Sequence, residues 1–448
     1  MQNKAEKGVQ NYVLSSFFCI FEKKVVPLRG FYTMASRIFK NITALGVLQI
    51  ANYLIPLLVL PIISRVLGAT LFGGVGYAQN IVSYLTLIVN YGFEYSATRQ
   101  IALASNDAER KCNIFWGVIS AKTMLLVFSF IILTLLTLFV ERISCDPRLY
   151  IYTALTNIGL VLFPTWYLQG EQQVDKMAWA NFFGKLLGST LIIAFVRETS
   201  EYRLYPLILS LSSIVVGVGS MTYVIRHFHI GKFVLKYKIL SEVFKTGFPI
   251  FMNNVFVSLY TMVNMTLLGM FATDDVVGYF SAAQRLIIAI NAIIVLPIST
   301  SVYPEICQRF EKSKQNGKQY LKRILVLSGI ASAVVSLFTF IAAPLVIDLI
   351  YGKEYTASIE ILQWLSPLPF LVMIATLLTV QGLYSMGLHR YAPWVGAILA
   401  VFCISLNLLL LPHLGAKATC LSWILAEVLE CLIVGTILLT KGRKSCSI

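Results

Sequence analysis

Long apolar runs dominate the sequence and limit the chain to a membrane fold. Each run holds about twenty residues, which as a helix is enough to cross a hydrocarbon core of about 30 Å. The runs do not alternate between apolar and polar residues, as the strands of a membrane barrel do. After Met34 we count about twelve of them: Ile42–Leu67, Val75–Tyr95, Ile114–Val140, Leu149–Leu168, Ala178–Val196, Leu204–Ile225, Thr246–Phe271, Val277–Tyr303, Ile324–Ile350, Ile359–Tyr384, Tyr391–Leu411 and Lys417–Thr440.

The composition leads to the same class of protein. Hydrophobic residues make up 57% of the 448 residues and charged residues only 13%, so a soluble core could not hide the apolar surface. We therefore expect an all-α integral membrane protein. The net charge of +15 does not indicate a nucleic-acid partner, because Lys and Arg in a membrane protein first set its orientation.

The second half of the chain repeats features of the first half about 200 positions later. The matches are Asn52 with Asn253, Leu67-Gly68 with Leu268-Gly269, and Gly76-Tyr77 with Gly278-Tyr279. Because six spans separate the copies, we expect two six-helix bundles related as parallel pseudo-repeats around a central cavity. The predicted domains are an N-terminal extension (1–33), a first bundle (34–225), a basic cytoplasmic linker (226–245), a second bundle (246–440) and a cytoplasmic tail (441–448).

The segment before Met34 fits this pattern poorly. Its apolar run, Tyr12–Phe21, is too short to cross a membrane. Met34 opens a short basic lead into the first span, so our hypothesis is that translation starts there; a genuine cytoplasmic tail or surface helix is the alternative. Counted from Met34, Lys and Arg outside the spans favour one side about threefold, which places both termini in the cytoplasm. An even number of spans is required for that arrangement.

The central linker, Arg226–Lys245, is rich in basic residues. It could lie as an amphipathic segment on anionic lipid headgroups. The alternative is a connection whose positive charge only sets the topology.

Several kinds of chemistry lack a sequence signal. The chain has no phosphate-binding loop of the G-x-x-x-x-G-K-[ST] type, and we place Gly73, Gly74 and Gly76 in a turn between the first two spans. The cysteines show no C-x-x-C spacing and the histidines no H-E-x-x-H pattern. We therefore expect no metal site, no cofactor and no catalytic residues. The short connections between spans also leave little room for a catalytic domain.

Three basic residues lie well inside the predicted spans, Lys122, Lys185 and Arg285, and Arg65 lies near the outer end of the first span. A charged side chain at mid-depth costs about 2.5–3.5 kcal/mol if it faces lipid, so Lys122, Lys185 and Arg285 should face the protein interior. Together they could line a cationic path for an anionic headgroup. The alternatives are that they snorkel to the membrane interface or pair with a nearby acid.

Four acids are candidates for ion coupling: Glu94, Asp348, Glu427 and Glu430. The last two lie three residues apart and share one helical face. Carboxyl groups in a low-dielectric interior could carry protons. Structural pairing with the cations is the alternative for each of them.

Asn52 and Asn253 occupy matching places near the starts of spans one and seven. Their pseudo-symmetric placement would put them across a cleft from each other, where they could bond sugar hydroxyls. The alternative is that they hold helices together at about 0.6 kcal/mol each.

Two stretches carry a family resemblance. LQIANYLIPLLVLPIISRVLG (48–68) followed by GYAQNIVSYLTLIVNYGFEYSATRQIA (76–102) resembles the opening of Wzx-type O-antigen flippases of the polysaccharide transporter family, within the multidrug/oligosaccharidyl-lipid/polysaccharide exporter superfamily. YGKEYTASIEILQWLSPLPF (351–370) resembles that family's signature between its ninth and tenth spans. Many relatives carry Asp where this chain has Asn90, so the resemblance assigns no acid at that position.

The resemblance implies a bacterial inner-membrane protein of lipopolysaccharide O-antigen biosynthesis. Such a protein moves an undecaprenyl-pyrophosphate-linked oligosaccharide from the cytoplasmic to the periplasmic leaflet and needs no covalent chemistry. Its expected partners are that substrate, membrane lipids, and a polysaccharide polymerase with its chain-length regulator.

Two other functions stay open. A polymerase or ligase would be expected to expose long periplasmic loops, and the outer loops here are short. A cation-coupled multidrug exporter of the same superfamily would favour buried acids and an aromatic cavity over a cationic one.

Overall fold

The computed structural model describes residues 55–104, 107–233 and 236–444, and every regular element in those ranges is a helix. This confirms the predicted all-α class. The first part of the chain forms α2 (Ile55–Asn90), α3 (Phe93–Ala104), α4 (Ala108–Phe139), α5 (Glu141–Ser144), α6 (Pro147–Ala154), α7 (Thr156–Leu162), α8 (Thr165–Gly170), α9 (Val174–Phe195), η2 (Thr199–Glu201) and α10 (Leu204–His227). The second part forms α11 (Tyr237–Phe271), α12 (Asp274–Lys312), α13 (Lys314–Ile350), η3 (Lys353–Tyr355), α14 (Ala357–Leu365), α15 (Leu368–Thr376), η4 (Leu377–Tyr384), η5 (His389–Tyr391), α16 (Ala392–Leu414) and α17 (Ala416–Lys444).

The number of spans agrees with the sequence. Among the described residues, 10 helices are long and apolar enough to cross a membrane, or 11 with the bent helix α11. One of the ten covers 50 residues, Ile55–Ala104, far more than the roughly twenty that one crossing needs. The backbone leaves the helical conformation at Gly68, with φ 67°, which divides this stretch into the end of the first predicted span and the second.

The turn between these two spans is not where we expected it. Gly73, Gly74 and Gly76 lie inside α2, and the break is at Gly68. At Gly73 an added Cβ would overlap the carbonyl oxygen of Asp274 in α12, and at Gly278 an added Cβ would overlap that of Ala69. The prediction of a turn at Gly73 was wrong. This glycine lies inside a helix and lets α2 and α12 approach each other closely.

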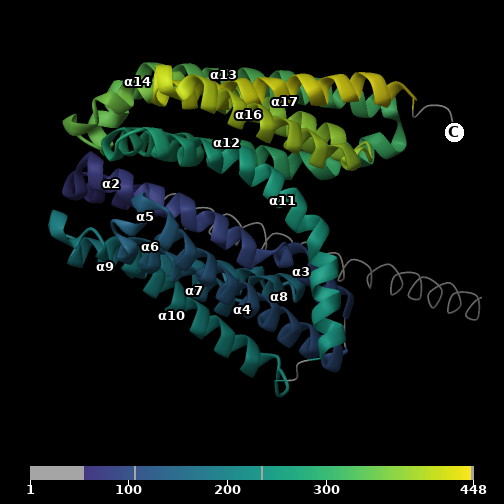
Figure 1. The fold of residues 1–448 in the computed structure, drawn as a ribbon. Helices are drawn as coiled ribbons and strands as arrows, with labels where there is room; N and C mark the ends of the chain where they lie inside the picture. Colours follow the sequence, from purple (N-terminus) through teal and green to yellow (C-terminus); the bar gives the residue numbers. More distant parts are fainter. Residues whose placement is uncertain (1–54, 105–106, 234–235, 445–448) are drawn as a thin grey trace, which may run out of the picture.

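The helices form two lobes, which Figure 1 shows one above the other. The N-lobe contains α2 to α10 and the C-lobe contains α12 to α17, while α2 and α12 face each other between them. The lobes meet at the end where Gly73 contacts α12, called here the closed end. They diverge toward α3 and α8, called here the open end, where α11 crosses from one lobe to the other (Figure 1).

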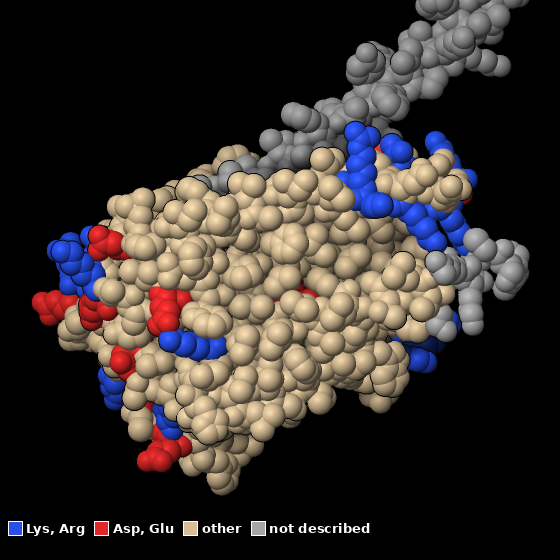
Figure 2. All heavy atoms as spheres, turned by 90° about the horizontal axis from the view of Figure 1, so that it is seen from above, with Lys and Arg blue, Asp and Glu red and all other residues tan. Residues whose placement is uncertain are grey.

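The surface has the charge pattern of a membrane protein. In Figure 2 a broad face with almost no charge separates charged groups gathered at its two ends, and Lys and Arg dominate the end nearer the C-terminus. Large apolar side chains such as Leu138 and Phe338 are exposed, as expected of residues that contact lipid. The cation-rich end is the open end, which favours a cytoplasmic location for it.

The predicted domain limits stay predictions. Helix α10 ends at His227 and α11 begins at Tyr237, so the second half of the proposed linker is helical. Residues 1–33 and Asn52 lie outside the described residues.

Candidate functional site

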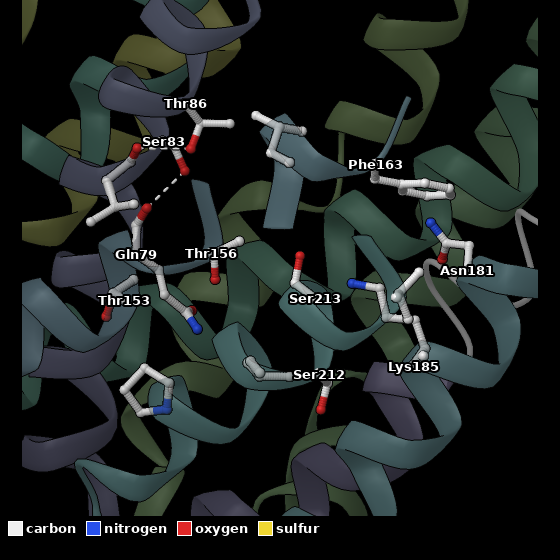
Figure 3. A pocket seen from close by; sticks show the side chains of 16 residues that line it. Gln79, Ser83, Thr86, Thr153, Thr156, Phe163, Asn181, Lys185, Ser212 and Ser213 are labelled. Atoms are coloured by element: carbon white, nitrogen blue, oxygen red, sulfur yellow. Dashed lines mark hydrogen bonds between the residues drawn. The ribbon is translucent and has the colours of Figure 1, made fainter. Parts of the chain in front are cut away.

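A cavity of about 370 Å³ lies inside the N-lobe, among α2, α6, α7, α9 and α10. Figure 3 shows the side chains that line it. Six are hydroxyl groups, two are amides and one is charged. These polar residues are Ser83, Thr86, Thr153, Thr156, Ser212, Ser213, Gln79, Asn181 and Lys185.

Helical spacing places these groups on the cavity wall. Gln79, Ser83 and Thr86 follow one another at intervals of four and three residues along α2, so they share a face. The Ser83 hydroxyl donates to the backbone carbonyl of Gln79 at 2.7 Å. The Thr86 hydroxyl donates to Asn157 Oδ1 at 2.7 Å and lies 3.0 Å from the Val82 carbonyl. Such bonds within the lobe satisfy the hydroxyl proton and leave the oxygen free to accept another bond.

Lys185 is the one charged residue of the cavity lining. It lies on α9 one turn after Asn181, and in Figure 3 its ammonium points into the cavity. Within the described ranges this ammonium has no carboxylate within ion-pair distance, and the buried Oδ1 of Asn181 has no hydrogen-bond partner. The cavity therefore presents a donor and an acceptor that the protein itself does not use.

Arg285 joins this cavity to the other lobe. From α12 its guanidinium donates to Gln79 Oε1 at 2.6 Å and lies 4.8 Å from the centre of the Phe72 ring. Gln79 also lines the cavity. Two of the four predicted cations, Arg285 and Lys185, are thus brought to one site, the first through Gln79 and the second directly.

Lys122 is placed differently. Its side chain is fully buried and its Nζ lies 3.4 Å from Glu94 Oε1. Glu94 also accepts hydrogen bonds from the Thr165 hydroxyl at 2.8 and 2.6 Å. This ion pair is the structural pairing that the sequence left open for both residues.

The remaining candidates lie away from the cavity. Arg65 donates to the Leu349 carbonyl at 2.8 Å near the closed end, where Asp348 is exposed. Asn253 is partly buried on α11. Asn52 lies outside the described residues, so the placement of the two asparagines across a cleft stays a prediction.

The two acids of α17 lie inside the C-lobe. Glu427 is 6% exposed, and its Oε1 accepts a hydrogen bond from Trp423 Nε1 at 3.3 Å. Glu430 accepts one from the Thr379 hydroxyl at 2.8 Å. Neither residue lines the N-lobe cavity.

Contacts between the lobes gather at the closed end. Arg142 of α5 reaches the C-lobe, where it donates to the carbonyls of Gly269 and Ala272 and pairs with the Asp274 carboxylate. The same guanidinium lies 4.4 Å from the centre of the Tyr77 ring. The Glu354 carboxylate also accepts from the Ala69 amide at 3.4 Å. These contacts hold the lobes together at that end.

The comparisons with known proteins identify the family. The sequence model described as "Polysaccharide biosynthesis protein" matches residues 38–310, which is more than half of the chain. The chain belongs to this family. The resemblance noted in its first hairpin is thereby confirmed.

Named relatives of this polysaccharide biosynthesis family member are transporters. A putative O-antigen transporter of Escherichia coli K12 is 28% identical over 406 residues, covering 89% of this chain and 95% of the relative. This supports the expectation of a transporter rather than an enzyme.

Solved structures share the fold of this family member. The lipid II flippase MurJ in an inward closed conformation has a TM-score of 0.71 at 14% identity, covering 90% of this chain and 87% of that one. An inward-facing multidrug resistance MATE family transporter of the MOP superfamily has a TM-score of 0.70 at 15% identity, covering 91% and 100%. The two-lobed architecture predicted from the repeat is that of these proteins.

Sequence reasoning missed most of the cavity wall in this family member. The signal on α2 was available, because Gln79, Ser83 and Thr86 form a polar stripe inside an apolar span. The hydroxyls of α6, α7 and α10 carry no comparable pattern. Arg142 was missed because it lies in a short connection, where a basic residue usually has no specific partner.

Proposed function

We propose that this chain translocates undecaprenyl-pyrophosphate-linked oligosaccharide repeat units, of the O-antigen type, from the cytoplasmic to the periplasmic leaflet of a bacterial inner membrane. The observation that carries the proposal is the hydroxyl-lined cavity with Lys185, joined by Gln79 to Arg285 of the opposite lobe. The O-antigen transporter named among the relatives supports this substrate class.

The chemistry of such a substrate matches the site. Its pyrophosphate cannot enter hydrocarbon without compensation, since an unpaired charge there is very costly. The Arg285 guanidinium presents a planar set of donors suited to phosphate oxygens. It is held by a neutral amide oxygen of Gln79, which a phosphate can replace with a stronger, charge-assisted bond.

The arrangement of the lobes supports alternating access from the cytoplasm. With both termini cytoplasmic, the closed end faces the periplasm and the open end faces the cytoplasm. Release to the periplasm then requires the contacts of Arg142 with Asp274 and of Glu354 with Ala69 to break. The polyprenyl tail stays in the bilayer while the glycan passes between the lobes.

This function implies that enzymes on the periplasmic side use the translocated unit. We propose that the chain supplies substrate to a polysaccharide polymerase and its chain-length regulator.

The test uses a strain that lacks this gene and retains the rest of its polysaccharide locus. Leaflet-specific labelling should find the lipid-linked repeat unit trapped on the cytoplasmic side, and an intact copy should release it. Arg285→Glu should fail to release it, whereas Lys176→Glu, which changes an exposed charge on α9, should succeed. A repeat unit that reaches the periplasm without the gene and remains unpolymerised would indicate a polymerase or ligase instead.

A further inference from the structure

The N-lobe cavity has features of a sugar site that the lipid carrier alone does not explain. We infer that it is a subsite for one sugar residue carrying a carboxylate, of the hexuronic acid type, within the translocated glycan. This inference rests on the proposed function and names the kind of repeat unit that the chain selects.

The charge of the cavity matches one carboxylate. Lys185 is its single charged lining residue, and Arg285 meets the cavity only through Gln79. A pyrophosphate carries at least two negative charges and is bound in proteins by several cations or by a cation with a metal ion. A hexuronate carries one negative charge, which one ammonium balances. The pyrophosphate is therefore better placed at Arg285, and the cavity is left for the glycan.

Four of the six hydroxyl groups of the cavity use their protons within the protein and present their oxygens as acceptors. Thr153 donates to the Leu149 carbonyl at 2.7 Å and Ser212 to the Ile208 carbonyl at 2.8 Å, as Ser83 does to the Gln79 carbonyl, while Thr86 donates to Asn157 Oδ1. Their oxygens can accept from a ligand that brings hydroxyl protons. A polyhydroxylated ring supplies these protons, whereas a lipid tail or an inorganic phosphate dianion does not.

Two polar groups of the cavity lack a partner, one of them a hydrogen-bond donor and the other an acceptor. The Lys185 ammonium needs an acceptor, and the buried Oδ1 of Asn181 has no donor among the described residues. The two side chains are one turn apart on the same face of α9. A buried polar atom without a partner is destabilising, so a ligand that offers a carboxylate beside a hydroxyl recovers free energy at both.

The size of the cavity indicates one ring rather than a whole repeat unit. Its volume of about 370 Å³ lies near the lower end of the roughly 300–1,000 Å³ of small-molecule sites. Phe163 and Leu160 give one side of the cavity an apolar wall, against which the C–H face of a pyranose can pack. The remaining sugars of the unit then lie outside this cavity.

The experiment compares soluble ligands on the purified full chain in uncharged detergent. Methyl β-D-glucuronide and methyl β-D-glucoside differ only at C6, which is a carboxylate in the first and a hydroxymethyl group in the second. The methyl ester of the glucuronide removes the charge and adds one methyl group. Saturation-transfer NMR titrations should give a dissociation constant at least about tenfold lower for the glucuronide than for either neutral ligand, as expected for one charge-assisted bond. Because this comparison needs no mutation, it does not depend on the folding of a variant.

Variants then test the role of Lys185. Lys185→Met should abolish the preference for the glucuronide, and Lys185→Arg should keep most of it. Lys176→Met, on the same helix but exposed, should leave it unchanged. Asn181→Ala should weaken the binding of all three sugars by a similar factor, because it removes an acceptor for a sugar hydroxyl.

Three results would overturn the inference. The glucuronide and the glucoside could bind equally, or the preference could survive in Lys185→Met. Inorganic pyrophosphate could instead displace the glucuronide in a Lys185-dependent way, which would make the cavity a site for the lipid carrier's anion. The proposed function is tested separately by leaflet labelling in cells, so flipping can stand while the acidic-sugar subsite fails.

Discussion

The interiors of the two lobes hold ionisable side chains of opposite type, basic in the N-lobe cavity and acidic in the C-lobe, although the sequence repeats features of one half in the other. In the N-lobe, Lys185 points into a cavity and has no carboxylate partner there. In the C-lobe, Glu427 and Glu430 are held by Trp423 and Thr379. An ionisable group whose hydrogen bonds are made within the protein contributes to packing, and one that faces a cavity is available to a ligand. On our proposals, recognition belongs to the N-lobe cavity, and the acids of the C-lobe have a structural role.

The largest effect is expected at Lys122, a fully buried cation of the N-lobe that is paired with Glu94. Glu94→Ala leaves the fully buried ammonium of Lys122 without its counter-charge, which should cost about 3–5 kcal/mol of folding free energy. Thermal melting in detergent should show a large loss of Tm, and Glu94→Gln combined with Lys122→Met should recover most of it. Lys185→Met removes an unpaired ammonium and should leave the Tm unchanged or raise it. If Glu94→Ala and Lys185→Met lowered the Tm by the same amount, the distinction between a structural Lys122 and a Lys185 available to a ligand would be wrong.

Arg285→Gln should give the next largest effect, this time on transport. Losing the guanidinium leaves a phosphate without its charged donor at the contact between the lobes, a cost of about 2–5 kcal/mol. The rate of lipid-linked repeat-unit translocation in proteoliposomes should fall at least about thirtyfold, while the Tm changes little. An unchanged rate would mean that the anion does not pass Arg285.

A smaller effect is expected where the lobes are held together. Arg142→Ala removes an ion pair and two carbonyl contacts at the closed end. Their loss should reduce the free energy that favours the closed state of that end by about 1–3 kcal/mol. Spin labels at the exposed Cys145 and at Lys353→Cys, with the other cysteines replaced, should report a longer distance in this variant. If the lobes are separate bodies, glucuronide binding to the N-lobe should be unaffected.

The smallest effect is expected at the acids of the C-lobe. Glu430→Gln keeps an oxygen that accepts from Thr379, and Glu427→Gln keeps one that accepts from Trp423. Each should change stability by no more than about 1 kcal/mol and leave the transport rate within about twofold. Transport that stops in either variant while the fold is retained would make the C-lobe an ion-coupling element and reverse the assignment of roles.

The fold was predictable from the sequence because each span carries its own signal. Twenty apolar residues must form a helix in lipid, whatever the rest of the chain does. The site was only half predictable, because the partners of a side chain depend on how helices are rotated against one another. Lys122 and Glu94 are 28 positions apart, and Arg285 and Gln79 are 206 apart. The sequence therefore named Lys122 and Lys185 correctly as interior residues, without telling that the first is paired with a carboxylate and the second faces a cavity. Arg65, near the outer end of its span, is exposed.

Helix α11 packs against both lobes, so a change in its bend moves the end that contacts the N-lobe. Its first part packs on the N-lobe, where Phe251 stacks on Tyr91 with ring centres 4.6 Å apart, and its last part packs on α16, where Asn407 donates to Asn264 at 2.8 Å. The two parts, Tyr237–Leu259 and Thr261–Phe271, meet at an angle of 45°. The first part is about 35 Å long, so a change of about 10° in this angle moves its far end by about 6 Å. Small adjustments near mid-membrane are thereby enlarged at the open end into a displacement about as wide as a sugar ring.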